Sequence, residues 1–384
     1  MTKEIKIINF MGQRKVAAMF SLLLLLGSIA SLAINGLQFG LDFTGGTQVE
    51  VGYEQPADLN AVRRVLKEEG LENSVAVFFG SDTDVLVRTQ GSLQDIAFTA
   101  ITAEITRQAP GAIVTIEKTV DKDKGDFSTQ LNVENAAGAN LAALFPASIY
   151  GAVKLEQEGN TSLVLTENSL GEAFTANLVQ ALAADANTGV ELRRSEFVGP
   201  QVGEELRDDG GLGMLFALAV VMVYVAMRFQ MKFSVGAVAA LAHDVVIVLG
   251  AFSILKLDFD LTVLAAVLAV IGYSLNDTIV VSDRIRENFR KLRKADALEV
   301  INMSLSQTLG RTMVTSFTTM LVLLALFFVG GELIHGFATA LIIGIVVGTY
   351  SSIYVAANVL LLMGVTKEDL MEPVKEGAEL DDMP

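Results

Sequence analysis

LTVLAAVLAVIGYSLNDTIVV, the stretch at residues 261–281, contains 21 residues and a single charged side chain, Asp277. Crossing a hydrocarbon core about 30 Å thick takes roughly 20 mostly apolar residues in helical conformation. The stretch therefore predicts a membrane-spanning helix. A carboxylate at membrane depth is costly, so Asp277 requires a partner, a water-filled path or a function.

Further apolar runs of similar length lie on both sides of this stretch. Together with it they predict an α-helical membrane protein with six transmembrane helices. The other runs cover approximately residues 16–33, 210–227, 233–255, 312–329 and 337–363.

The first of these runs has a second interpretation, because basic residues precede it and Ser31-Leu32-Ala33 has the small residues of a signal-peptidase site. A cleavable signal peptide is therefore the alternative to a first transmembrane helix at 16–34.

The composition agrees with a chain whose charges are separated from its apolar runs. Of the 384 residues, 52% are hydrophobic and 19% are charged. The absence of Cys excludes disulfides and Cys-ligated metals, and only two His residues exclude a His-rich centre, so no metal site and no cofactor are predicted. A net charge of -16 argues against a nucleic-acid partner.

The distribution of basic residues predicts the orientation of the helices. The N-terminal segment 1–15, the turn at 228–232 and a loop at 283–311 are rich in Lys and Arg and fall on one side if every run spans. Positive residues favour the cytoplasmic side. Both termini, including an acidic tail at 364–384, are therefore expected in the cytoplasm, and residues 210–363 form a five-helix membrane domain.

The segment 35–209 is too long for a connection and predicts an exported domain. Residues 35–211 contain 27 of the 44 acidic residues and only 12 of the 28 basic ones. The pattern starts as strand, helix, strand, strand, which is typical of an α+β fold with helices on one face of an antiparallel sheet. GLDFTGGT at 40–47 is expected to be two extended pieces around a Gly-Gly turn, and Asp121–Asp126 a charged turn.

A weak internal repeat is present in this segment. Ser92–Ala100 resembles Ser169–Ala176, and each copy is predicted to be a helix that leads into a strand. At its end, Gly199-Pro200 halts a strand before a polar helix, a junction expected to be either a simple linker or a hinge.

Other polar residues lie within the apolar runs. His243 and Asp244 are near the middle of their run, and Arg311 precedes a band of Thr and Ser residues that includes Thr315. Asp277 and Arg311 start from the same side of the membrane and could form a structural ion pair. The pair could instead be made and broken as the carboxylate takes up and releases a cation. In a third interpretation Arg311 snorkels to the surface.

Motifs of soluble enzymes are absent from the sequence. It has no G-x-x-x-x-G-K-[ST], H-E-x-x-H or G-x-S-x-G pattern, so no enzymatic activity and no catalytic residue are predicted. An intramembrane aspartyl protease would need two facing carboxylates, which Asp244 and Asp277 could supply, but no Gly-x-Gly-Asp motif supports it.

Motifs spread over the whole chain resemble the SecF family, the smaller subunits of SecDF protein-export complexes. They are GLDFTGGT at 40–47, EFVGPQVGEEL at 196–206, AHD at 242–244, IGYSLNDTIVVSDRIR at 271–286 and QTLGRT at 307–312.

The resemblance implies a fold of the resistance-nodulation-division (RND) type, in which six helices pair with six of SecD, and a first run that is kept as an anchor. It also implies a multi-pass protein of the bacterial inner membrane, surrounded by lipid, that works with the SecYEG channel and SecA on translocating preproteins. The exported domain is expected to be ferredoxin-like and expanded, with an insertion near 92–168. By family, the proton gradient, or sodium in some members, drives the process.

Site residues follow from the same resemblance. Asp277 matches the membrane carboxylate of the family and Arg311 the arginine that faces it, so these two are the expected ion relay. A second group is expected near the pathway or in helix packing, and a third belongs to the motifs of the exported domain. The second group is His243, Asp244, Asn276, Tyr273 and Thr315, and the third is Asp42, Phe43, Gly45, Gly46, Gly199 and Pro200.

Two alternatives remain at this point. The chain could be half of an RND-type pump for small molecules or lipids, or a non-conducting scaffold of the translocon. The residues suit either H⁺ or Na⁺ as the coupling ion.

Overall fold

The computed structural model describes residues 7–72, 74–117, 127–135, 139–229, 231–292 and 295–366. The charged turn expected at 121–126 and almost all of the acidic tail at 364–384 lie outside the described residues. The chain divides into two units, one formed by Met1–Gly40 with Arg207–Pro384 and the other by Leu41–Leu206.

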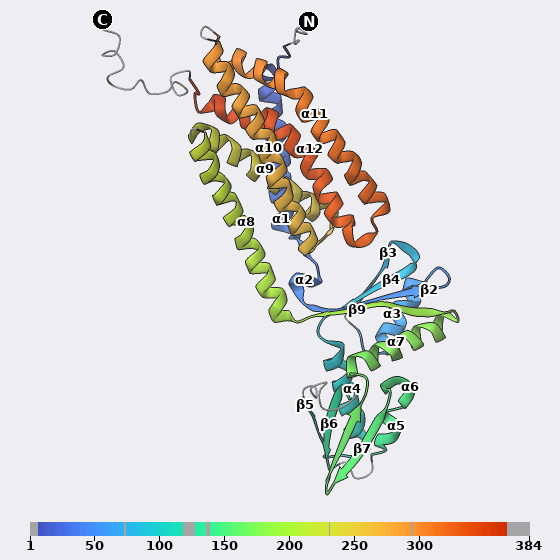
Figure 1. Cartoon of the computed structure of the whole chain (residues 1–384). Helices are drawn as coiled ribbons and strands as arrows, with labels where there is room; N and C mark the ends of the chain where they lie inside the picture. Colours follow the sequence, from blue (N-terminus) through green and yellow to red (C-terminus); the bar gives the residue numbers. More distant parts are fainter. Residues whose placement is uncertain are drawn as a thin grey trace, which may run out of the picture. The chain divides into compact units, whose positions relative to one another are not determined.

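The first unit is a helical bundle (Figure 1), and the described residues contain six helices long and apolar enough to cross a membrane. The prediction of six membrane helices is thus confirmed, and the chain is a multi-pass membrane protein. The helices are α1 (Arg14–Asn35), α8 (Pro200–Arg228), α9 (Met231–Leu255), α10 (Leu261–Lys291), α11 (Ala297–Val329) and α12 (Glu332–Leu362).

The prediction of a loop at 283–311 is wrong, because most of this segment is helical. Helix α10 continues to Lys291, and α11 already begins at Ala297. The segment contains many charged residues, but it also carries an apolar stripe that belongs to the bundle core. The Asp296 side chain caps α11 by accepting a hydrogen bond from the backbone N–H of Glu299. The stripe consists of Ile285, Phe289, Val300, Ile301 and Leu305.

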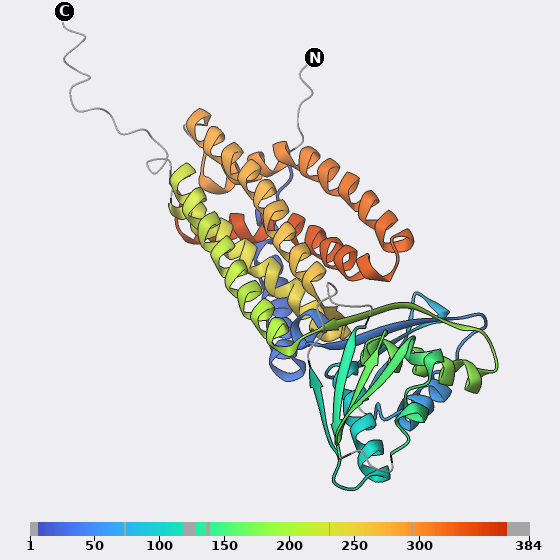
Figure 2. The same cartoon turned by 60° about the horizontal axis from the view of Figure 1, so that its bottom comes forward.

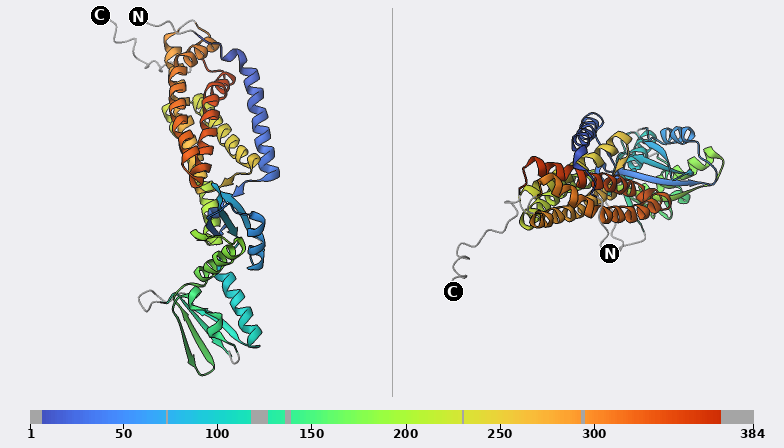
Figure 3. Two further views of the ribbon diagram at one scale, coloured as in Figure 1. Left: turned by 90° about the vertical axis from the view of Figure 1, so that its right-hand side faces the viewer. Right: turned by 90° about the horizontal axis from the view of Figure 1, so that it is seen from above.

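Helix α1 lies along one side of the bundle (Figure 3) and packs through small side chains. The Ser31 and Ser253 hydroxyls are hydrogen-bonded at 2.8 Å, and a Cβ on Gly250 would lie 2.2 Å from Ser28 Cβ. Such close contacts are typical of membrane helices that pack without large side chains between them. Helix α1 is therefore an integral part of this bundle, which agrees with a retained anchor.

The segment before α1 is attached to the start of α11. A short 3-10 helix, η1 (Met11–Gln13), follows Ile8, whose N–H donates to Ser306 Oγ at 2.9 Å. The Met11 N–H donates to Asn302 Oδ1, also at 2.9 Å. The N-terminal segment and the α10–α11 hairpin thus lie at the same end of the bundle.

Two short strands occur within the bundle unit. Strand β1 (Gln38–Phe39) pairs in parallel with β10 (Asp258–Phe259), which connects α9 to α10. The end of α1 and the α9–α10 turn are therefore joined by backbone hydrogen bonds.

The second unit contains a four-stranded antiparallel sheet in the order β3-β4-β2-β9. Helices α3 (Leu59–Glu68) and α7 (Leu170–Ala186) pack on one face, where side chains such as Val51, Val85 and Leu182 form a core. With the chain order β2, α3, β3, β4, α7, β9, this arrangement is the expected ferredoxin-like α+β fold. The strands are β2 (Gly46–Tyr53), β3 (Val75–Phe79), β4 (Ser81–Thr89) and β9 (Val190–Val198).

The residues between β4 and α7 carry a second antiparallel sheet, in the order β5-β6-β8-β7, with a separate core (Figure 2). This sheet occupies the segment for which the insertion near 92–168 was expected. Its elements are α4 (Leu93–Gln108), β5 (Ile113–Glu117), β6 (Thr129–Glu134), α5 (Leu141–Leu144), α6 (Ala147–Tyr150), β7 (Val153–Glu158) and β8 (Thr161–Thr166).

The internal repeat corresponds to similar structures in both copies. Ser92 and Ser169 cap the N-termini of α4 and α7, and the two helices lead into β5 and β9. The strands join different sheets, so the copies share local structure and not topology.

Candidate functional site

Asp277 is the membrane carboxylate on α10, and its residue is 3% exposed. Among the described residues, its Oδ2 has no hydrogen-bond partner, and neither does the hydroxyl of the adjacent Thr278. A buried acceptor that lacks a partner is unfavourable in hydrocarbon. Asp277 is therefore not a satisfied structural anchor in this conformation.

Arg311 lies on the next helix, α11, and is exposed. It lines a cavity of about 280 Å³ between the ends of α8, α10 and α11, together with Asp283, Glu287 and Thr308. In the part of the chain that the structure describes, no ion pair joins Arg311 to Asp277, although its charge interacts with the carboxylate at longer range. The direct Asp277–Arg311 contact remains a hypothesis.

Asp244 on α9 lies at the centre of a hydrogen-bonded cluster and is fully buried, at 0% exposure. Its Oδ1 is 2.9 Å from His243 Nδ1. Its Oδ2 accepts hydrogen bonds from Ser274 Oγ on α10 at 2.6 Å and from Ser351 Oγ on α12 at 2.7 Å. The carboxylate thus joins three helices.

The His243 ring is also buried, and it stacks on Tyr350 with a centroid distance of 6.3 Å. Its Nε2 has no hydrogen-bond partner among the described residues. The Tyr350 hydroxyl donates to the Ala17 carbonyl of α1 at 2.7 Å. The histidine is therefore fixed in orientation while one ring nitrogen remains unpaired.

Glycines of α12 allow α10 to approach this cluster closely. A Cβ on Gly348 would lie 3.1 Å from Ser274 Cβ and 3.5 Å from Asp244 Oδ2. A Cβ on Gly344, one turn earlier, would lie 2.1 Å from Val270 Cγ2. The close packing of α10 on α12 thus depends on positions without side chains.

The other predicted membrane residues have separate positions. The Tyr273 hydroxyl donates to Ser316 Oγ at 3.2 Å, and Ser316 in turn bonds Thr349 at 2.8 Å, which links α10, α11 and α12. The Thr315 hydroxyl bonds back to the carbonyl of Arg311 in its own helix. Asn276 is exposed on α10. Tyr273 therefore contributes to helix packing, whereas Asn276 faces away from the chain's own bundle.

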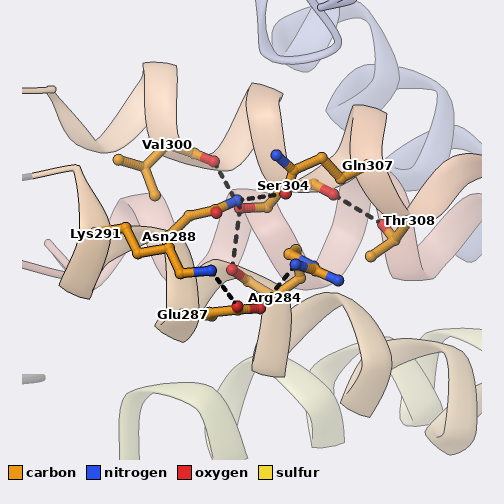
Figure 4. A network of polar contacts seen from close by, with 8 residues as sticks. All are labelled: Arg284, Glu287, Asn288, Lys291, Val300, Ser304, Gln307 and Thr308. Atoms are coloured by element: carbon orange, nitrogen blue, oxygen red, sulfur yellow. Dashed lines mark hydrogen bonds and ion pairs between the residues drawn. The ribbon is translucent and has the colours of Figure 1, made fainter. Parts of the chain in front are cut away.

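A polar network fixes α10 against α11 near the connection between them (Figure 4). The amide of the buried Asn288 donates to Ser304 Oγ at 2.8 Å and to Gln307 Oε1 at 2.9 Å. Around it, Glu287 binds Lys291 and Arg284 on the surface of α10. Asp277 and Arg311 lie further along the same two helices. The network therefore fixes the positions of these two residues relative to each other along the helix axes.

The motif residues of the Leu41–Leu206 unit form a compact junction. Leu41–Thr44 is a helical turn (α2) closed by the Gly45 N–H and the Leu41 carbonyl, and not the extended piece that was expected. Gly45 and Gly46 then take positive φ values of 66° and 124°, which favour glycine. Phe43 is buried at 4% exposure, and Asp42 lies in the same turn.

The end of the unit packs on this turn. A Cβ on Gly45 would lie 2.6 Å from Pro200 Cα, and one on Gly203 would lie 3.0 Å from the Phe43 carbonyl carbon. Gly199 separates β9 from Pro200, which begins α8. The first and last motifs of the unit therefore form one site.

Several residues of these sites were not singled out from the sequence. Ser351 and Gly348 lie in an apolar run, and a single hydroxyl or glycine in such a run gives no specific signal of a site. Asn288 lies in the segment that was expected to be a loop. The spacing of Gly344 and Gly348 was the available signal, since small residues four apart favour close helix packing. No group of three or more His, Cys, Asp or Glu side chains that could hold a metal occurs in the described ranges.

Comparison with known proteins identifies the family. The sequence profile for "Protein export membrane protein SecD/SecF, C-terminal" matches residues 178–366, and the "SecD/SecF GG Motif" profile matches residues 30–57. The Protein translocase subunit SecF of Vibrio alginolyticus is 41% identical over 384 residues, covering 100% of this chain and 98% of the relative. The chain belongs to the SecF family.

Other SecF relatives give the same result. That of Pseudomonas aeruginosa is 42% identical and covers 100% of both chains, and that of Escherichia coli O157:H7 is 35% identical over 97% of this chain and 94% of its own. The crystal structure of SecDF, a translocon-associated membrane protein from Thermus thermophilus, matches with a TM-score of 0.67 and 30% identity. The match covers 94% of this SecF chain and 39% of the SecDF chain.

Proposed function

We propose that the chain is the SecF subunit of a SecDF complex and assists Sec-dependent protein translocation on the outer side of the bacterial inner membrane. In this proposal SecD is its direct partner, the SecYEG channel and SecA act beside it, and translocating preproteins are its clients. Proton movement through Asp277 and Arg311 drives the cycle. Its role is mechanical and not enzymatic.

The observation that carries the ion relay is the environment of Asp277. Its Oδ2 is buried on a membrane helix and has no partner among the described residues, while the charge of Arg311 acts on it from α11. A carboxylate held between a neutral and an ionised state can bind and release a proton as the arginine approaches and withdraws. One charge moved through 100 mV yields about 2.3 kcal/mol, which supports a conformational cycle.

The surface of α10 supports a helical partner such as SecD. Alongside Leu268, α10 exposes a stripe of small and polar residues, whereas α11 exposes mostly large apolar side chains such as Val314 and Phe317. Lipid contact alone favours large apolar side chains, whereas small residues favour close contact with another helix. The small and polar residues of the α10 stripe are Ala265, Ala269, Gly272 and Asn276.

The orientation follows from charge. The N-terminal segment and the α10–α11 hairpin lie at one end of the bundle and carry Arg14, Lys15, Arg284 and Lys291. Positive residues favour the cytoplasmic side. We therefore assign both termini to the cytoplasm and the Leu41–Leu206 unit to the outer side.

The coupling ion in this proposal is H⁺. A single buried carboxylate with an unpaired oxygen suits proton binding, whereas Na⁺ prefers several oxygen ligands around it. Na⁺ is the alternative. Repeating the export assay described below at several sodium concentrations and a fixed pH distinguishes the two ions, because only a sodium-coupled protein depends on the sodium concentration.

The test is export of a reporter preprotein in cells depleted of their own SecF and supplied with wild type, Asp277→Asn or Glu299→Gln. Glu299 is an exposed carboxylate on α11 that does not line the Arg311 cavity, and it is the matched control. We expect normal membrane levels for all three proteins and loss of export support for Asp277→Asn alone. Full export with Asp277→Asn would contradict the relay and favour a non-conducting scaffold, and substrate efflux without an export defect would favour an RND-type pump.

A further inference from the structure

The His243–Asp244 cluster is a buried ionisable group of the described membrane helices that the proposed relay does not use. Asp244 and His243 have side chains that are 1% and 3% exposed, and they lie near the middle of a 25-residue membrane helix. An isolated carboxylate at this depth is costly, so neutralisation by a proton stabilises the pair. The neutral pair contains one proton that can be located on either residue, and release of this proton leaves one negative charge on Asp244, to which two serine hydroxyls donate.

The hydrogen bonds of the cluster show how this proton can be held. Both oxygens of Asp244 are engaged, Oδ1 with His243 Nδ1 and Oδ2 with two serine hydroxyls. The carboxylate and imidazolium form is stabilised by these three donors. In the alternative form the carboxyl proton lies between Asp244 and His243 Nδ1, and the serine hydrogen bonds persist.

Ser274 connects the cluster to the proposed relay. It precedes Asp277 by three residues on α10, so the two side chains lie on the same helix face about 4.5 Å apart along the axis. Its hydroxyl donates to Asp244 Oδ2 at 2.6 Å, the shortest hydrogen bond of the cluster. Ser351 donates to the same oxygen at 2.7 Å from α12, away from Asp277.

We propose that the His243–Asp244 pair is a second proton-binding station, linked to Asp277 through the Ser274 hydroxyl. The inference rests on the proposed relay and extends it toward the middle of the membrane. In this step the Asp277 side chain, whose Oδ2 has no hydrogen-bond partner among the described residues, first rotates toward Ser274 Oγ. A proton then passes from Asp277 to Ser274 Oγ while the hydroxyl proton of Ser274 moves to Asp244 Oδ2, and the His243–Asp244 pair changes from one negative charge to neutral. One O–H bond breaks and one forms at Ser274, Asp277 becomes a carboxylate, and no electron is transferred.

Few other ionisable groups face the pair. Among the described residues, the phenol of Tyr350 on α12 stacks on His243 and in turn contacts Tyr354. Asp277 lies three residues after Ser274 on α10, and the charge of Arg311 acts on it from α11. The part of α1 that packs on α9, residues 21–31, has no ionisable side chain. Changes in proton binding can therefore be assigned to the pair or to Asp277.

The test uses the full chain with its SecD partner in liposomes that contain a pH-sensitive dye. Proton flux under an imposed membrane potential is compared for wild type, Asp244→Asn, Ser274→Ala, Ser351→Ala and Asp277→Asn, with chromatography of each complex to verify assembly. We expect Asp244→Asn and Asp277→Asn to reduce flux by about a hundredfold and Ser274→Ala by about tenfold. Ser351→Ala, which removes a hydrogen bond to the same oxygen but leaves Ser274 in place, should reduce flux by less than Ser274→Ala does.

The outcomes separate the two proposals. Wild-type flux in Asp244→Asn together with loss in Asp277→Asn would overturn the second station and leave the relay intact. Equal losses of flux in Ser274→Ala and Ser351→Ala would overturn the proposed link through Ser274. They would indicate that the cluster stabilises the packing of three helices. Loss in Asp244→Asn with normal flux in Asp277→Asn would contradict the relay and also overturn the link from Asp277 through Ser274.

A second measurement does not depend on transport. Infrared difference spectra recorded as the pH is varied report the C=O stretch of a protonated carboxylic acid. We expect a protonation band that Asp244→Asn removes and that His243→Gln shifts to another pH. A spectrum unchanged by both variants would show that Asp244 does not titrate and would overturn the proposal.

Discussion

Gly45 and Pro200 approach each other backbone to backbone: a Cβ on Gly45 would lie 2.6 Å from Pro200 Cα. Gly45 also has a φ of 66°, which L side chains rarely adopt. We predict that Gly45→Ala destabilises the Leu41–Leu206 unit by about 2 to 4 kcal/mol, because strain and a clash with rigid backbone add together. Hydrogen exchange of the β2–β9 ladder, followed by mass spectrometry, measures the effect.

The control for this prediction is Gly91→Ala. Gly91 has a φ of 82° but no atom within 4 Å of its Cβ position, so only the backbone strain applies, at about 1 kcal/mol. Equal loss of protection in the two variants would mean that the contact between the motifs contributes nothing.

The glycines of the bundle are predicted to act in two different ways. A Cβ on Gly344 would lie 2.1 Å from Val270 Cγ2, whereas Gly272 has nothing within 4 Å in this chain. Gly344→Ala should destabilise the bundle by about 2 kcal/mol through overpacking. Gly272→Leu should leave the bundle stable and reduce binding to SecD by about tenfold or more, because it fills the proposed contact surface. Thermal stability in detergent and copurification with SecD measure the two effects, and retained copurification of Gly272→Leu would reject that surface.

Asn288 is predicted to stabilise the α10–α11 hairpin. Asn288→Leu removes hydrogen bonds to Ser304 and Gln307, and side-chain hydrogen bonds in membrane proteins contribute about 1 kcal/mol. A double-mutant cycle with Ser304→Ala isolates the direct contact. Glu287→Gln, which removes only exposed ion pairs, should cost less than about 0.5 kcal/mol. A coupling energy near zero would contradict the assigned role.

Tyr53 is predicted to make the Leu41–Leu206 unit sensitive to alkali. Burial, and secondarily the charge of Asp185, raise its pKa from 10.0 to about 12. Because the folded state holds the proton more tightly, this stability is present below pH 10 and is lost as the pH rises toward 12, by about 2 kcal/mol. Denaturation midpoints of the unit at several pH values should fall in wild type and fall less in Tyr53→Phe. Parallel curves for the two proteins would refute the assignment.

The fold was largely predictable because its strongest signals are local. Twenty apolar residues in a row have no other stable location than a membrane, and alternation in residues 46–53 is strong enough to predict a strand. The α10–α11 hairpin was not predicted because its many charged residues are typical of a loop, although Ile285 and Phe289 have helical spacing. The turn at Leu41–Thr44 was missed because its helical form depends on packing of Phe43.

The candidate site was predictable only in its charged members. Asp244, Asp277 and Arg311 stand out because charges are rare in apolar runs. Their partners Ser274 and Ser351 do not, since a single hydroxyl is tolerated in a membrane helix by bonding its own backbone. Which hydroxyl meets which carboxylate depends on the rotation and depth of three helices, and these are set by long-range contacts such as that of Gly348 with Ser274.

The helical continuation of α10 past the membrane span has a mechanical consequence. From Asp277 to Lys291 the helix is unbroken, which corresponds to about 21 Å at 1.5 Å per residue. A tilt of about 10° that pivots at Asp277 would move the tip of the hairpin by roughly 4 Å, as a stiff rod amplifies rotation at its base. In the proposed relay, a change in the protonation of Asp277 that tilted α10 would therefore produce a displacement of several ångströms at the hairpin, where a neighbouring molecule can contact it.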